Sequence, residues 1–129
     1  MNVELLEQVK GTFLRHPKRL DMGFWVRSAN DGLSDTALVK TLLEDCGTTG
    51  CIAGLACALG GEQELSSCLI PSTAQKLLGL TDSEAVRLFY AHKWPGEFAL
   101  AYFGATEPAA RAEIAASRID HFIETNGAE

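Results

Sequence analysis

The chain has 129 residues, of which 47% are hydrophobic and 22% are charged, and these are the values of an ordinary globular domain. A chain of this length buries roughly two-thirds of its unfolded surface, so it needs neither a metal ion nor a disulfide in order to fold. Its 11 basic and 17 acidic residues give a net charge of −6, which disfavours nucleic acid as a partner. We therefore expect one domain over residues 1–129.

The sequence contains no signal for a membrane or for export. No apolar run approaches the roughly 20 residues of a membrane span, and the first residues lack the basic and apolar stretches of a signal peptide. We therefore expect a cytoplasmic protein without membrane contact, whose cysteines are reduced thiols. One basic cluster is interpreted as a solvated helix end: Arg15, His16, Lys18 and Arg19.

The first predicted element is a helix over about residues 3–16. Asn2 is suited to cap this helix, apolar residues recur in it at helical spacing, and Pro17 ends it. The aromatic segment 20–26 follows, and its periodicity fits either a strand or a helical turn.

A second helix is predicted from Ser34 to about residue 44. Residues 46–50 are predicted to form a tight loop. The stretch over about residues 50–59 carries no charge, and an element that is apolar on all sides is buried. We therefore expect a buried central helix there, with an accessible amino end, and the glycine pair 60–61 stops it.

The second half of the chain predicts further helices. Pro71 suits the first turn of a helix that ends before Gly79. The residues 81–84 have the pattern of a capping box, and the helix that they open presents an apolar face that continues to His92. Two more helices are predicted over about residues 95–103 and 106–125.

The predicted fold class is all-α. No segment combines alternating β-branched residues with hairpin turns, although a small two-stranded piece near Phe24 is compatible with the sequence. The elements above predict a compact single-domain bundle of about six or seven short helices around the central helix at about 50–59.

The start of the central helix carries the first candidate site. Cys46 and Cys51 both lie there, and the amino end of a helix lowers the pKa of a thiol. With a histidine beside it, such a thiolate is the nucleophile of a hydrolase or transferase, and His92 is the best-placed histidine. The cysteine spacings lack the short Cys-x2-Cys pairs of structural zinc sites, so no metal or cofactor is expected.

The same loop offers a second chemistry that needs no catalysis. Backbone amides and two hydroxyls ahead of a helix bind phosphate, carboxylate or sulfate, and these groups would come from Gly47, Thr48, Thr49 and Gly50. The alternative interpretation is that one threonine caps the helix and the glycines supply the turn. The loop is not a nucleotide P-loop, because no lysine follows its last glycine.

Two tryptophans complete the candidate site. Trp25 and Trp94, together with Phe98, Tyr102 and Phe103, are suited to line a cleft, although the core is the more common place for such residues. The leading hypothesis is a non-enzymatic accessory domain that binds a small anion or a protein partner, with weak self-association as a homo-oligomer as a further option. The alternative hypothesis is the thiol-dependent enzyme that uses Cys46 or Cys51 with His92.

The residues 46–54, Cys-Gly-Thr-Thr-Gly-Cys-Ile-Ala-Gly, resemble the signature Cys-Gly-Thr-x-x-Cys-x-Ala-Gly of a family of small uncharacterised bacterial and phage proteins. The chain differs from that family in having Leu55 where an aromatic residue often follows, and in having one more residue before Trp25. The resemblance implies a compact helical unit of bacterial or mobile-element origin with no assigned activity. Weaker matches lie at residues 21–25, 78–80, 88–89 and 94–95.

Overall fold

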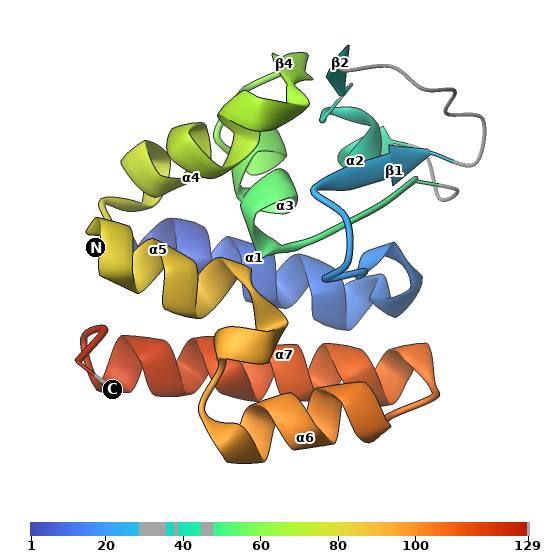
Figure 1. Cartoon of the computed structure of the whole chain (residues 1–129). Helices are drawn as coiled ribbons and strands as arrows, with labels where there is room; N and C mark the ends of the chain where they lie inside the picture. The colour runs from blue at the N-terminus through green and yellow to red at the C-terminus, as the bar shows by residue number, and fades with distance from the viewer. Residues whose placement is uncertain (29–35, 38, 45–47, 129) are drawn as a thin grey trace.

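Seven α-helices and two short antiparallel strand pairs make up the part of the chain that the computed structural model describes, residues 1–28, 36–37, 39–44 and 48–128 (Figure 1). The predicted all-α class is confirmed there, since no strand exceeds three residues. The helices are α1 (Val3–Arg15), α2 (Thr41–Glu44), α3 (Ile52–Leu59), α4 (Ile70–Leu78), α5 (Asp82–Phe89), α6 (Gly96–Gly104) and α7 (Pro108–Glu124). Short 3-10 turns are η1 (Pro17–Arg19), η2 (Ser67–Leu69) and η3 (Ala91–Lys93).

Helix α3 is the buried centre of the fold. Its residues 52–58 are all buried, and α1, α2, α4 and α5 pack around it (Figure 1). The prediction of an uncharged central helix is therefore confirmed, with the helix beginning at Ile52. The prediction of an accessible amino end is wrong, because Gly50 and Cys51 are buried as well.

Helices α1, α7 and α6 form the layer beneath α3 (Figure 1). The amphipathic α1 begins at its expected cap, since the Asn2 side chain accepts a hydrogen bond from the Leu5 N–H (3.1 Å). It packs along α7, and the Lys10 Nζ bonds the Asp120 carboxylate at 2.7 Å. None of the described helices is long and apolar enough to cross a bilayer.

The boundaries of α4 and α5 follow the predicted signals. Gly79 ends α4 in the left-handed conformation (φ 66°), which glycine adopts without a steric penalty. Thr81 and Glu84 form the predicted capping box at the start of α5. Helix α5 stops at Phe89 because Tyr90 is extended, so His92 lies in η3 and does not continue the helix face as predicted.

Two strand pairs correct the predictions for residues 34–50. Strand β1 (Val26–Ser28) pairs with β3 (Thr48–Gly50), and β2 (Thr36–Ala37) pairs with β4 (Leu65–Ser66), all antiparallel. The expected helix from Ser34 is wrong at 36–37, and the expected loop is wrong at 48–50. Both strands are specified by partners far along the chain, and such pairing overrides local propensity. The two-stranded piece near Phe24 is β1 with β3.

Candidate functional site

Backbone hydrogen bonds fix the segment 20–25 against the start of α3. The Asp21 N–H donates to the Gly50 carbonyl (2.9 Å), and the Trp25 carbonyl accepts from the Cys51 N–H (3.3 Å). The first bond lies near the start of the segment, and the second lies at its end, directly before β1 begins at Val26. The backbone of the segment therefore has a defined course across the start of α3.

Two glycines of the 46–54 motif make room for that segment. A Cβ on Gly50 would lie 2.7 Å from the Trp25 carbonyl oxygen, and a Cβ on Gly54 would collide with the same oxygen. Only a residue without a side chain lets the two backbones approach so closely. The motif thus has a structural task in this chain, which is to seat Trp25 on the central helix.

Helix α6 holds the segment from the other side. The Tyr102 hydroxyl accepts a hydrogen bond from the Met22 N–H (3.0 Å), and burial raises the pKa of this tyrosine. Trp94 lies 5.3 Å from the Tyr102 ring and donates its Nε1–H to the Leu88 carbonyl (2.9 Å). Trp94 is buried, so it belongs to the core and supports the site from beneath.

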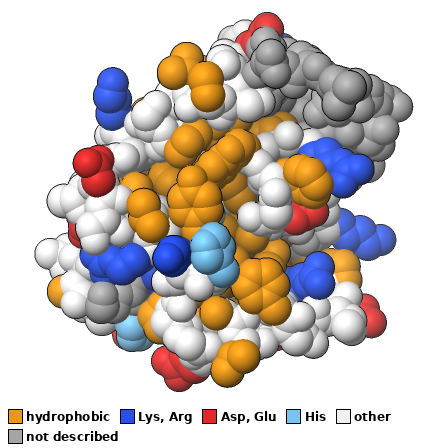
Figure 2. Space-filling view, viewed as in Figure 1, with side chains coloured by type: hydrophobic (Ala, Val, Ile, Leu, Met, Phe, Trp, Pro, Cys, Tyr) orange, Lys and Arg blue, Asp and Glu red, His pale blue; other side chains and the backbone are white. Residues whose placement is uncertain are grey.

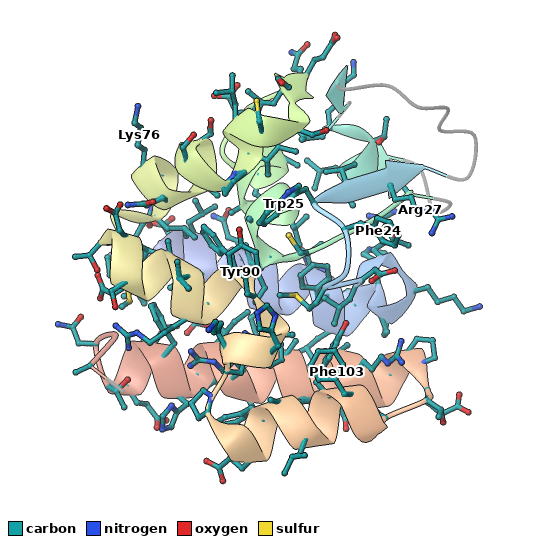
Figure 3. All side chains as sticks on the ribbon, viewed as in Figure 1. Phe24, Trp25, Arg27, Lys76, Tyr90 and Phe103 are labelled. Atoms are coloured by element: carbon teal, nitrogen blue, oxygen red, sulfur yellow. The ribbon has the colours of Figure 1, made fainter. Side chains whose placement is uncertain are left out.

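Four aromatic side chains, which we call the aromatic face, lie on the same side of the molecule: Phe24, Trp25, Tyr90 and Phe103 (Figure 3). The Trp25 and Tyr90 rings meet edge to face, with centroids 5.5 Å apart. The exposed fractions are 42% for Phe24, 37% for Tyr90 and 61% for Phe103. The Arg27 guanidinium lies 4.6 Å from the centroid of the Phe24 ring, which places a cation at the edge of this face.

Two adjoining hollows flank Tyr90. One of about 380 Å³ lies between residues 22–26 and the end of α5, and the other of about 320 Å³ lies between α4 and α5 and reaches Val86. Both are lined by Phe89 and Tyr90, so they meet at this point. Figure 2 shows the apolar side chains gathered across this side of the molecule. The result is an open groove of mixed apolar and polar lining, with Tyr90 as the ridge between its two hollows.

The environments of Cys51 and His92, the expected catalytic residues, differ from those predicted. Cys51 is 1% exposed, and burial raises the pKa of its thiol to about 11, whereas the helix amino end was expected to lower it. His92 is exposed in η3, where its ring contacts the Tyr90 ring at 5.9 Å. Cys46 lies outside the described residues. Desolvation therefore outweighs the helix dipole at Cys51, and its thiol stays protonated at neutral pH.

The expected anion-binding loop is a strand over its described residues, 48–50. Thr48–Gly50 is strand β3, and Thr48 and Gly50 are buried. The Thr48 hydroxyl has no hydrogen-bond partner among the described residues, and Thr49 is half-buried. Gly47 lies outside the described residues. The three described members of the set do not present a turn of exposed amides ahead of a helix, and they serve the pairing with β1.

Of the predicted site residues that the structure describes, only Trp25 lines the groove. Phe103, which was also expected to be suited to a cleft, is exposed and belongs to the aromatic face, whereas Phe24 and Tyr90 had no clear signal in the sequence. Tyr90 directly follows Leu88 and Phe89, which are buried in the core, and its backbone is extended because α5 ends at Phe89.

Comparison with protein-family models, with curated proteins and with solved structures finds no match to this chain. Within the described ranges, no three His, Cys, Asp or Glu side chains are grouped so that they could hold a metal ion. The site is therefore characterised by its geometry: exposed aromatic side chains lie beside two adjoining hollows.

Proposed function

We propose that this protein is a non-enzymatic interaction domain that binds a protein partner through the aromatic face. The observation that carries the proposal is the grouping of Phe24, Trp25, Tyr90 and Phe103 on one side, with three of them more than a third exposed. Exposed groups of large apolar side chains are uncommon on monomers and mark interaction sites. Tryptophan, tyrosine and arginine are also the residues that contribute most to binding at protein interfaces.

The shape of the groove favours a protein over a small anion. The two hollows beside Tyr90, of about 380 and 320 Å³, are each far larger than a small anion, and together they offer room for several side chains of a partner. Small-molecule pockets enclose most of their ligand, which a surface with a ridge at its centre does not do. Protein interfaces instead combine apolar anchors with an open polar rim.

The hydrogen bonds and close packing that fix the backbone around Trp25 support the same function. The Trp25 carbonyl accepts a hydrogen bond from the Cys51 N–H and packs against Gly54. The nearby Met22 N–H donates to the Tyr102 hydroxyl, which fixes the same segment. A surface that is ordered before binding loses less conformational entropy when the partner docks. The thiol-dependent reaction has less support, because it would have to begin at the enclosed Cys51 or at Cys46.

The cellular setting is part of the proposal. We place the domain in the cytoplasm, where its cysteines would be reduced, and we retain the bacterial or mobile-element origin that the resemblance at residues 46–54 implies. This setting is independent of the binding surface and is not needed for the test below.

The experiment is a selection of random peptides displayed on phage against the immobilised full chain, after which the binding of each enriched peptide to the Tyr90→Ala/Phe103→Ala variant is measured separately. Phe103 is largely exposed, so the fold should survive its loss, and circular dichroism of the variant checks this. We expect enriched peptides that share an apolar anchor and that the variant does not retain. The proposal fails if repeated selection enriches nothing, or if the folded variant retains the same peptides.

A further inference from the structure

A basic hollow lies next to the aromatic face. The side chains of Arg15, His16, Lys18 and Arg19, together with Pro17, form one wall of a hollow of about 470 Å³, and Glu107, Pro108 and Ala109 form the other, so that the lining contains four basic side chains and one carboxylate. The first wall consists of the end of α1 and the turn η1, and the second is the start of α7. We call this feature the basic hollow.

The charge in this region is opposite to that of the whole chain. Residues 15–27 contain four lysine or arginine residues and one carboxylate, Asp21, although the chain has a net charge of −6. The Asp21 carboxylate accepts a hydrogen bond from the Gly23 N–H (2.8 Å). Among the described residues, neither Lys18 nor Arg19 forms an ion pair, although the Glu107 carboxylate also lines the hollow, so the cations of the hollow outnumber its carboxylate.

Both walls of the basic hollow continue directly into the aromatic face. Met22 lies three residues after Arg19, and Glu107 lies four residues after Phe103. An extended chain covers at most about 3.6 Å per residue, so these steps span no more than about 11 Å and about 14 Å. A docked segment of about eight to ten residues is long enough to contact both features.

We infer that the partner's docking segment is acidic beside its apolar anchor. An apolar side chain would occupy the hollow at Trp25 and Tyr90, and Asp or Glu side chains would enter the basic hollow. This inference rests on the proposed function and adds the chemistry of the partner. Charge complementarity of this kind speeds association and selects against basic partners, and its contribution decreases as salt screens the charges.

The test uses the peptides from the selection on the wild-type chain. We expect the enriched sequences to combine an aromatic or aliphatic residue with an excess of Asp and Glu. A synthetic version of one such peptide should bind at least about tenfold more weakly at 500 mM NaCl than at 50 mM NaCl, because the Debye length shortens to a few ångströms.

A matched pair of charge reversals locates the effect. Arg15→Glu/Lys18→Glu changes the basic hollow, and Lys40→Glu/Lys76→Glu changes the net charge equally on exposed residues that do not line it. We expect at least about tenfold weaker binding for the first variant and less than about twofold for the second.

Three results would overturn the inference. They are enriched peptides without acidic residues, equal losses in both reversal variants, or binding of inorganic phosphate or a single-stranded oligonucleotide at the basic hollow without binding of acidic peptides. If the peptides still need Tyr90 and Phe103 in the first two cases, the acidic partner is rejected and the aromatic face stands. If no peptide needs Tyr90 or Phe103, the proposed function itself is rejected.

Discussion

The carbonyl oxygen of Trp25 occupies the space where Gly54 would carry a side chain. This contact joins two stretches that are far apart in the sequence, the aromatic segment 20–25 and the motif 46–54. It explains why glycine is needed within a helix, where it otherwise costs about 1 kcal/mol relative to alanine. The position of Trp25 and the packing of the central helix therefore depend on each other.

Gly54→Ala should therefore destabilise the fold. The new methyl group must displace the backbone of Trp25, and overpacking of this kind lowers the free energy of unfolding by roughly 1–3 kcal/mol. Urea unfolding followed by circular dichroism measures the change. The control is Gly104→Ala, where a Cβ meets nothing within 4 Å, and where we expect a change within about 1 kcal/mol. Equal stabilities of the two variants would show that Trp25 is not seated on Gly54.

Tyr102→Phe should loosen the aromatic face without removing it. The variant loses the acceptor of the Met22 N–H, which is worth about 0.5–1.5 kcal/mol of stability. Hydrogen exchange of the Met22 amide, followed by NMR, should become faster while α7 stays protected. Tyr90→Phe, which removes an exposed hydroxyl, is the matched control and should leave this amide unchanged. Unaltered exchange in Tyr102→Phe would contradict the assigned hydrogen bond.

The thiols should differ in reactivity according to their burial. Cys68 is exposed, whereas Cys51 and Cys57 are buried, and burial raises the pKa of these two thiols to about 11 and about 12. Iodoacetamide at pH 7.5, with site-resolved mass spectrometry, should modify Cys68 in the native protein, and Cys51 and Cys57 only after unfolding. Fast labelling of Cys51 that His92→Ala slows would instead support the thiol-dependent enzyme.

The same two thiols predict a decrease in stability at alkaline pH. In the unfolded chain they ionise near pH 8.5, but in the folded chain burial keeps them protonated to about pH 11 for Cys51 and about 12 for Cys57. Between these values the folded state binds more protons, so stability falls as pH rises, by up to about 1.4 kcal/mol per pH unit for each thiol. Urea unfolding between pH 8 and 10.5 should show a smaller slope for Cys51→Ala/Cys57→Ala than for the wild type. Identical slopes would mean that neither thiol is desolvated.

Local signals in the sequence were sufficient for most of the helices. The uncharged run at 52–59, the cap at Asn2 and the capping box at Thr81 each depend on residues that are neighbours in the chain. The strands could not be predicted in this way, because β3 pairs with residues 26–28 and its threonines and glycine are also typical of a turn. A buried arginine, Arg118, is likewise invisible to periodicity, since it is held by the Arg87 carbonyl of another helix.

The site was predicted only in part, for a similar reason. Trp25 was identified by residue type, but its exposure depends on the tertiary contacts with Gly54 and with Tyr102 through Met22. Trp94 has the same residue type and is buried. The sequence placed Cys51 at a helix amino end correctly, but it did not reveal the burial that raises the thiol pKa.

The affinity of a selected peptide for variants of the aromatic face tests the central claim most directly. Tyr90→Ala and Phe103→Ala each remove a side chain of the face, and Leu100→Ala is the control, because Leu100 is 80% exposed on the same helix as Phe103 but is not a member of the aromatic face. Isothermal titration should give dissociation constants at least about tenfold higher for the first two variants, as expected for interface hot spots, and less than about twofold higher for Leu100→Ala. Unchanged affinity in the Tyr90 and Phe103 variants, or an equal loss in Leu100→Ala, would contradict binding through this face.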